Sequence, residues 1–340
     1  MGGGQAFALR LCRWLATAEP DRQLRLLCAG GSELALSAAE DGIAVVDADF
    51  PPPALRGAVG ASGALVRIRR LLARAPADAI VIANSARVQA YAVPVWSTLR
   101  GGGSLVSVMH ERESAKRLSA RLALRRTGAV AAVGESGVST YTAALRGTPV
   151  AKIVNFLLPE EFERMARQRT AASGGQPPVV GVLSRMCRGK GIPELLDELA
   201  RHPESWQRLL VAAPFQEPDY VEAVRDRCRL RGLADRVELL GAVSPVEGFL
   251  AAIDFLVVPS VAREAMPTVI LEGLACGRPA LVRSHIWTRD YEGLPVTGYD
   301  TARELAQRLA EPPPAPVGAA ELSARFHPAA VVETLERIAR

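Results

Sequence analysis

The sequence alternates short, continuous apolar runs with segments of helical pattern along most of its length, and this repetition constrains the fold most. The runs are apolar at successive positions, as parallel strands covered on both faces are, and not at every second position. Strands are expected at 24–30, 43–48, 79–85, 104–110, 128–134, 151–156, 179–184, 208–214, 237–243, 254–260 and 279–284. This βα repetition predicts an α/β fold built on doubly wound sheets.

Two breaks divide this pattern. The chain has 340 residues, 49% of them hydrophobic, which is more than one ordinary core needs. A Ser-, Gly- and Pro-containing stretch at 167–178 and a proline-rich stretch at 311–318 interrupt the repetition, and a helical segment at 328–340 follows the second. The sequence therefore predicts two α/β domains and a tail helix. Ligands are expected beyond the carboxyl ends of the strands, in a cleft between the domains.

Composition excludes several classes of protein. The five cysteines are scattered and form no CxxC pair, so neither a disulfide framework nor a zinc knuckle is predicted, and a reducing cytoplasm fits best. No apolar run reaches the roughly 18 residues of a membrane-spanning helix, and no signal segment is recognised. The expected location is cytoplasmic.

Charge is distributed unevenly. Residues 1–150 hold 18 Lys and Arg against 11 Asp and Glu, whereas the remaining residues hold 23 against 25. A basic first half fits an anionic partner, such as a lipid surface, a phosphorylated acceptor or nucleic acid, and fits equally a solvated arginine-rich surface. Charge alone does not distinguish an anionic partner from a solvated surface.

The stretch REAMPTVILEGLACGRP, residues 263–279, places two glutamates in apolar surroundings. Glu264 is expected in the loop after a strand, and Glu272 on a helix that starts near Pro267. Free N–H groups at that helix start can hold a phosphate. A carboxylate buried without partners is costly, so Glu272 needs hydroxyl donors, and a ribose supplies two. The alternative, that Glu272 faces solvent and Glu264 caps the helix, is equally compatible with the spacing.

A second constellation lies in VGVLSRMCRGKGIPELLDEL, residues 180–199. A predicted strand leads into a loop that holds Arg185, Arg188 and Lys190, and a helix follows. Cations beside a helix N-terminus form a diphosphate site that can neutralise a leaving diphosphate without a metal. The sequence is not a Walker loop, because GxxxxGK[ST] is absent. An ordinary exposed basic loop is the alternative.

Together, the two constellations resemble those of GT-B glycosyltransferases of family 4 type (glycosyl transferases group 1). VGVLSRMCRGKG is similar to the VGxxxRxxxxKG signature of that family, and PSVAREAMPTVILEGLACGRP is similar to its E-x7-E segment, in the same order. The resemblance implies two Rossmann-like domains that face each other across a cleft, with a tail helix crossing back to the first. The expected boundaries are 1–155 for the acceptor-side domain, 156–322 for the nucleotide-sugar domain and 323–340 for the tail helix.

The resemblance also implies roles for individual residues of the second domain. Arg185 and Lys190 would grip the donor diphosphate and stabilise the charge that develops as it leaves. Glu272 would accept hydrogen bonds from the ribose hydroxyls, and Glu264 would orient the transferred sugar near the reacting carbon. Thr268 would help to hold phosphate or sugar.

The first domain gives weaker signals. MGGGQAFALRLCRWLA resembles the Gly-rich loop and first helix of the family, which makes Gly3 and Gly4 candidates for an acceptor or phosphate loop. The strand that precedes this loop in the family is missing, which leaves three alternatives: a misassigned start codon, a trimmed chain, or a sheet that lacks the strand. His110 ends an expected strand, and the resemblance makes it a candidate catalytic residue in contact with the donor sugar. A structural role for a lone histidine is as compatible with the pattern.

The function implied is a retaining glycosyltransferase that moves a sugar from a UDP- or GDP-sugar to a glycan, a lipid-linked molecule or a small molecule. No cofactor, no metal and no nucleic acid are expected. A nicotinamide dehydrogenase is disfavoured, because no GxGxxG follows a strand with an acidic residue about 20 positions on. A non-catalytic binding or partner subunit with the same fold is the open alternative.

The stretch 113–128 reads as a basic amphipathic helix. One interpretation is contact with anionic headgroups, which would place the protein at the inner face of a membrane. The other is a solvated helix face packed on the sheet.

Overall fold

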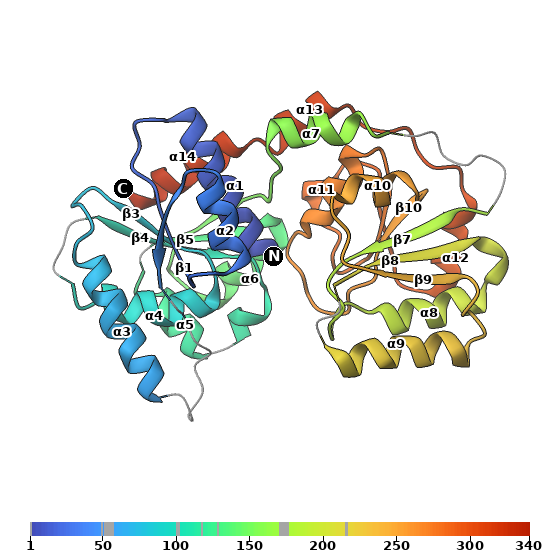
Figure 1. Ribbon diagram of the computed structural model, residues 1–340, viewed down its shortest axis with the longest axis horizontal. Helices are drawn as coiled ribbons and strands as arrows, with labels where there is room; N and C mark the ends of the chain where they lie inside the picture. The colour runs from blue at the N-terminus through green and yellow to red at the C-terminus, as the bar shows by residue number, and fades with distance from the viewer. Residues whose placement is uncertain are drawn as a thin grey trace. The chain divides into compact units, whose positions relative to one another are not determined.

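The computed structural model describes residues 2–48, 50, 58–99, 103–116, 118–127, 129–169, 177–214 and 217–340. The chain forms two compact α/β units, which are shown in Figure 1. Unit 1 comprises the residues up to Leu158 together with Phe326–Arg340, and unit 2 comprises Pro159–Arg325. No described helix combines the length and the apolar character needed to cross a bilayer.

The elements of unit 1 alternate between helix and strand. In chain order they are α1 (Gly3–Ala18), β1 (Arg25–Cys28), α2 (Glu33–Glu40), β2 (Ala44–Asp47), α3 (Ala58–Leu72), β3 (Ile80–Ala83), α4 (Ala86–Trp96), β4 (Ser104–Met109), the 3-10 turn η2 (Glu113–Lys116), α5 (Leu118–Leu124), β5 (Ala129–Val133), α6 (Gly134–Ala144), β6 (Val150–Ile153) and α14 (Pro328–Ala339).

The described strands of unit 1 form two parallel sheets. One pairs β1 with β2, and the other has the order β3-β4-β5-β6. β4 and β5 are almost wholly buried, whereas β1 and β3 are both exposed at their first residue and buried only at their last. Among the described residues, β1 and β3 are edge strands, and they remain apolar, since they read RLLC and IVIA.

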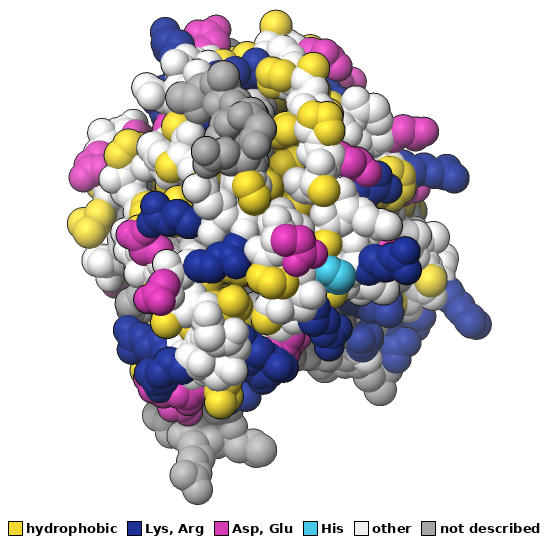
Figure 2. Space-filling view, turned by 90° about the vertical axis from the view of Figure 1, so that its right-hand side faces the viewer, with side chains coloured by type: hydrophobic (Ala, Val, Ile, Leu, Met, Phe, Trp, Pro, Cys, Tyr) yellow, Lys and Arg dark blue, Asp and Glu magenta, His cyan; other side chains and the backbone are white. Residues whose placement is uncertain are grey.

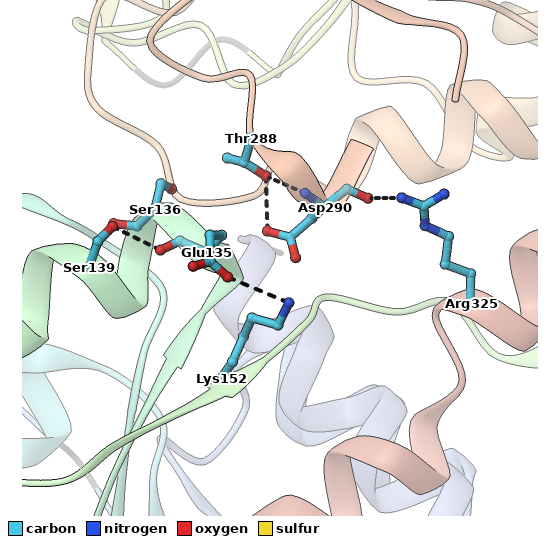
Figure 3. A network of polar contacts seen from close by, with 7 residues as sticks. All are labelled: Glu135, Ser136, Ser139, Lys152, Thr288, Asp290 and Arg325. Atoms are coloured by element: carbon cyan, nitrogen blue, oxygen red, sulfur yellow. Dashed lines mark hydrogen bonds and ion pairs between the residues drawn. The ribbon is translucent and has the colours of Figure 1, made fainter. Parts of the chain in front are cut away.

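The tail helix α14 is part of unit 1, where it packs on β4, β5 and β6. Its N-cap His327 meets the ring of Trp14 from α1 edge to face at 4.9 Å. Near its other end, Glu336 forms an ion pair with Arg22. Elsewhere in unit 1, Figure 3 shows Lys152 on β6 directed at Glu135 on α6, with 3.7 Å between their charged atoms. The first two contacts hold α14 against α1 and the loop after it, and the third joins α6 to β6.

Unit 2 repeats the alternation with more strands in one sheet. Its elements are α7 (Pro159–Ala166), β7 (Val179–Leu183), α8 (Ile192–Arg201), η3 (Pro203–Ser205), β8 (Arg208–Ala212), α9 (Pro218–Leu230), β9 (Val237–Gly241), α10 (Val246–Ala251), β10 (Phe255–Val258), α11 (Thr268–Ala275), β11 (Ala280–Arg283), η4 (Arg289–Tyr291), β12 (Val296–Tyr299), α12 (Ala302–Ala310) and α13 (Ala319–Arg325). The described sheet is parallel, in the order β12-β11-β10-β7-β8-β9.

The core of unit 2 follows from the alternation of side chains along each strand. Val180 and Val182 point to the face that α8, α9 and α12 cover, and there they join one large buried cluster. Gly181 points to the opposite face, where a β-carbon would lie 2.5 Å from the Ile253 side chain. Figure 1 shows α8 and α9 on one side of this sheet and α10 and α11 on the other. The doubly wound arrangement predicted from the apolar runs is confirmed.

Two features differ from the sequence-based expectations, and a third is mostly untested. β12 was not expected. The stretch 113–128, expected as one basic helix, forms the 3-10 turn η2 and then the seven-residue helix α5; Arg117 and Gly128 lie outside the described residues. Most of the break expected at 167–178 lies outside them as well.

The surface carries both signs of charge. Figure 2 shows a face of the molecule on which Lys and Arg side chains are interspersed with Asp and Glu side chains. In unit 2, for example, the carboxylate of Asp197 accepts hydrogen bonds of 2.7 Å from both Arg227 and Arg231. Burial raises the pKa of Asp197, but these hydrogen bonds outweigh it and the pKa lies below its ordinary value.

Candidate active site

Two loops of unit 2, which follow β7 and β10, are joined through their backbones. β7 and β10 are neighbours, and the strand order reverses between them, which is where doubly wound sheets bind ligands. The carbonyl oxygen of Gly189 in the first loop accepts hydrogen bonds from the amides of Val261 (2.9 Å) and Ala262 (3.0 Å) in the second. The two constellations identified in the sequence are therefore one structure.

Gly191 explains why the first loop can approach so closely. Its φ is +69°, a left-handed conformation that glycine adopts without strain. A β-carbon at this position would lie 2.0 Å from the carbonyl oxygen of Pro259, at the end of β10. The second glycine of the sequence GKG thus lets the loop after β7 rest against the loop after β10, and it forms the N-cap of α8.

Lys190 and Glu264 form an ion pair between the two loops. The Lys190 Nζ donates to the Glu264 Oε1 at 2.9 Å, and the side chains are 18% and 22% exposed. This exposure is low enough to fix both side chains and high enough for a ligand to reach them. An ammonium beside a carboxylate offers adjoining sites for an anion and for hydroxyl donors.

The other predicted cations are more exposed. Arg185 lies on the surface and makes no ion pair with a described residue. Arg188 has a side chain that is 79% exposed, with its Nε 3.9 Å from the Glu217 carboxylate. An arginine that is free in solvent retains its bidentate fork for an incoming phosphate.

The start of α8 offers less to an anion than the sequence suggested. The amide of Ile192, the first helical residue, already donates to the hydroxyl of Tyr220 at 3.1 Å, and Pro193 has no N–H. Burial raises the pKa of Tyr220 to about 12, so this hydroxyl stays neutral. The expected contribution of this helix N-terminus to a diphosphate site is therefore reduced.

The start of α11, unlike that of α8, has backbone amides placed to bind an anion. Its N-cap is Pro267, and no side chain caps its first turn. Thr268 is the first helical residue, so its amide and that of Val269 lie where orphan helix donors occur. Glu272 lies one turn further along, half-buried, while Ala265 and Met266 before the helix are buried.

A short turn at residues 288–291 holds Tyr291 within the electrostatic influence of Glu264. The Thr288 hydroxyl accepts from the amide of Asp290 at 3.1 Å, and Arg325 donates to the carbonyl oxygen of Asp290 at 2.8 Å, as Figure 3 shows. The turn buries Tyr291 completely. Burial raises the pKa of Tyr291 well above its ordinary value, and the charges of Asp290 and Glu264 raise it further.

The predicted residues of unit 1 gather at the start of α1. Gly3 and Gly4 form the first turn of this helix and not a loop before it. The ring of His110, which follows β4, lies next to this turn: a β-carbon on Gly4 would be 3.4 Å from the His110 Cδ2. Asn84, which follows β3, contacts both, and the sequence analysis missed it. An asparagine directly after an apolar strand resembles an ordinary turn residue, so only its place beside His110 reveals it.

Residues 177–311 match the family model described as Glycosyl transferases group 1. No curated protein sequence matches the chain.

Solved structures resemble the whole fold. The structure of Anabaena Alr3699/HepE in complex with UDP and glucose is 19% identical, with a TM-score of 0.77 over 99% of this chain and 96% of that chain. Sucrose-phosphate synthase from Thermosynechococcus elongatus is 17% identical, with a TM-score of 0.68 over 99% and 88%. The lipopolysaccharide outer core galactosyltransferase WaaB is 14% identical, with a TM-score of 0.65 over 99% and 92%.

The chain therefore has the GT-B fold of glycosyltransferases, and residues 177–311 within it resemble the group 1 glycosyltransferase family. The fold and the family resemblance predicted from the sequence are confirmed.

Proposed function

We propose that the protein transfers a sugar, with retention of anomeric configuration, from a nucleoside diphosphate sugar to a glycan, lipid-linked or small-molecule acceptor held by unit 1. The Lys190–Glu264 ion pair carries this proposal, because it places a phosphate-binding cation and a hydroxyl-binding carboxylate 2.9 Å apart at the strand-order reversal of unit 2. The Anabaena structures contain UDP or UDP-glucose, which supports UDP as the first nucleotide to test.

The diphosphate would lie against Lys190, Arg185 and the first turn of α11. Lys190 supplies a point charge, Arg185 a mobile fork, and the amides at Thr268 a partial positive charge. These groups stabilise the negative charge that builds on the diphosphate oxygen as its bond to the sugar breaks. This arrangement supports transfer without a metal.

The hydroxyl groups of the donor would be held by carboxylates. Glu272 would accept hydrogen bonds from the ribose, and Glu264 from the transferred sugar. Because Lys190 already contacts Glu264, a donor that engages both residues positions its sugar relative to its diphosphate. His110 would contact the sugar from unit 1.

A thermal-shift comparison of UDP, GDP and NAD tests the nucleotide class. Stabilisation by UDP or GDP, unchanged when EDTA is present, is the expected result, because a ligand that binds only the folded state raises the melting temperature. Stabilisation by NAD alone would indicate a dehydrogenase, and stabilisation by none of the three would favour a non-catalytic partner subunit.

The membrane interpretation of 113–128 stays a proposal. Leu122 on α5 is 46% exposed, and Arg125 beyond the helix is exposed as well, which supports an accessible basic and apolar surface. Sedimentation with anionic vesicles at low salt is expected to carry the protein down. Failure to sediment would leave α5 as a solvated surface helix.

A further inference from the structure

Asn84 joins three elements of unit 1 at one point. β3 and β4 are parallel neighbours, with Ala83 in register with Ser107. Asn84 directly follows β3 and His110 directly follows β4. The Oδ1 of Asn84 lies 2.7 Å from the Nε2 of His110, and its Nδ2 donates to the carbonyl oxygen of Gly4 in α1 at 2.5 Å.

The second of these contacts determines the direction of the first. A backbone carbonyl oxygen only accepts hydrogen bonds, so the amide nitrogen of Asn84 must face Gly4. The amide oxygen therefore faces His110, and it too only accepts. The hydrogen between them must then belong to the Nε2 of His110. The contacts with Gly4 and Asn84 therefore fix both the orientation of the Asn84 amide and the tautomer of His110.

The surroundings keep the ring neutral and fixed. Phe7 from α1 meets the His110 ring edge to face at 4.8 Å, and Phe7 in turn packs against Phe156 at 5.2 Å. Burial lowers the pKa of His110 to about 4, so the ring is uncharged at neutral pH. With a hydrogen on Nε2, the Nδ1 of His110 carries a lone pair, and no described residue donates a hydrogen bond to it.

We propose that Asn84 is a positioning residue that holds His110 as a hydrogen-bond acceptor at Nδ1, so that this atom receives a hydroxyl group of the ligand and not a phosphate oxygen. A sugar hydroxyl can donate to a lone pair, whereas a phosphate oxygen without a proton cannot. The proposal rests on the proposed function for the identity of the ligand. The tautomer itself does not depend on that function.

Long-range proton–nitrogen NMR of the histidine rings tests the tautomer in the wild-type protein. The chain has four histidines, and the His110→Gln variant identifies the signals of His110. We expect nitrogen shifts of a neutral ring with its hydrogen on Nε2, unchanged at any pH from 8 down to about 5. Signals of the Nδ1–H tautomer, or of the rapidly exchanging mixture seen in exposed rings, would overturn the proposal.

Variants of Asn84 separate positioning from general structure. Asn84→Ala removes both contacts and is expected to give a mixture of tautomers. Asn84→Asp places a carboxylate beside the ring and should raise the titration midpoint of His110 by about one pH unit or more. Ser85→Ala is the matched control, because Ser85 caps α4 through the amide of Val88 and does not touch His110. An unaltered His110 spectrum in both Asn84 variants contradicts the proposal.

Sugar transfer provides a separate readout. If the proposal holds, Asn84→Ala raises KM for the sugar ligand or lowers kcat, while Ser85→Ala leaves both within about twofold of the wild type when assayed below its melting temperature. Loss of the Nε2–H signal without any kinetic effect would contradict the ligand contact only. Inactivity of the wild-type protein with an intact Nε2–H signal would contradict the proposed function and leave the tautomer standing.

Discussion

At the residue scale, Lys190 and Glu264 each already have a partner before any donor arrives. Both are partly buried, so neither charge is fully solvated, and each offsets part of the desolvation of the other. A diphosphate would compete with Glu264 for the ammonium of Lys190, and a sugar hydroxyl would compete with Lys190 for the carboxylate. The pair therefore keeps two oppositely charged groups ready without leaving either unpaired.

This competition gives opposite expectations for two substitutions. Lys190→Ala is expected to weaken UDP binding about 10- to 100-fold, because it removes a charge-assisted contact and leaves the Glu264 carboxylate facing the phosphates. Glu264→Gln should bind UDP as tightly as the wild type or more tightly, because Lys190 is released. Isothermal titration calorimetry measures both.

A matched control for this experiment is Arg229→Ala, because Arg229 is an exposed cation of the same unit that pairs with Asp226 and Glu222 on its own helix. It should leave UDP binding unchanged. Weaker binding in Glu264→Gln than in Lys190→Ala would contradict the assignment of Lys190 to the diphosphate.

At the element scale, the site depends on how closely the loop after β7 approaches the loop after β10. We expect Gly191→Ala to lower the free energy of unfolding by about 3 kcal/mol or more. Alanine is strained at the positive φ of this position, and its β-carbon would clash with the Pro259 carbonyl oxygen. Gly232→Ala is the control: its φ is +65° but a β-carbon meets nothing within 4 Å, so about 1 kcal/mol is expected. Equal losses in chemical denaturation would show that the loop contact is unimportant.

The strands of the two units should also differ in amide exchange. β7 is paired on both sides, by β8 and β10, whereas β1 and β3 are each paired on one side among the described residues. Amides of β7 are therefore expected to exchange most slowly, and those of β1 and β3 much faster. Mass-spectrometric hydrogen exchange measures this directly. Protection of β1 and β3 equal to that of β7 would mean that a further strand pairs with them.

The strands that could be predicted from the sequence are those that lie within continuous apolar runs. β5 and β10 are buried along their whole length, which is why their continuous apolar runs are visible in the sequence. β12 was not predicted because it reads VTGY, in which Thr297 and Gly298 interrupt the apolar run. Its Gly298 lies against Ser284, where a β-carbon would meet the Ser284 Oγ at 3.1 Å. A short strand of mixed polarity gives no periodic signal.

The residues of the candidate site can be singled out in the sequence, but their contacts cannot. Lys190 and Glu264 stand out through their motifs, yet their ion pair depends on β7 lying beside β10 and on the conformation of Gly191, and neither is encoded locally. The hydrogen bond from the Ile192 amide to the Tyr220 hydroxyl joins α8 to α9. No sequence pattern in either helix predicts it. The contact between Asn84 and His110 depends on the pairing of β3 with β4, which the sequence alone does not show.

At the scale of the whole molecule, unit 1 and unit 2 are each compact, with parallel sheets and helices of their own. Residues 1–150, which carry a net positive charge, all lie in unit 1. Residues 151–340, which include the whole of unit 2, carry a slightly negative net charge. Such a division fits a protein whose nucleotide site is built from a few placed cations and whose acceptor side has a general affinity for anions. An assay of sugar transfer by the whole chain tests the nucleotide site of unit 2 and the acceptor side of unit 1 together.

Release of UDP or GDP from a panel of donor sugars tests the central claim most directly, with water as the acceptor where no other is supplied. The wild-type protein is expected to release nucleotide from at least one donor, and Glu264→Gln and Lys190→Ala are each expected to lower that rate about 100-fold, because each removes stabilisation of the transition state. Release from no donor, or equal release by the wild type and both variants, would contradict a glycosyltransferase site at the Lys190–Glu264 pair.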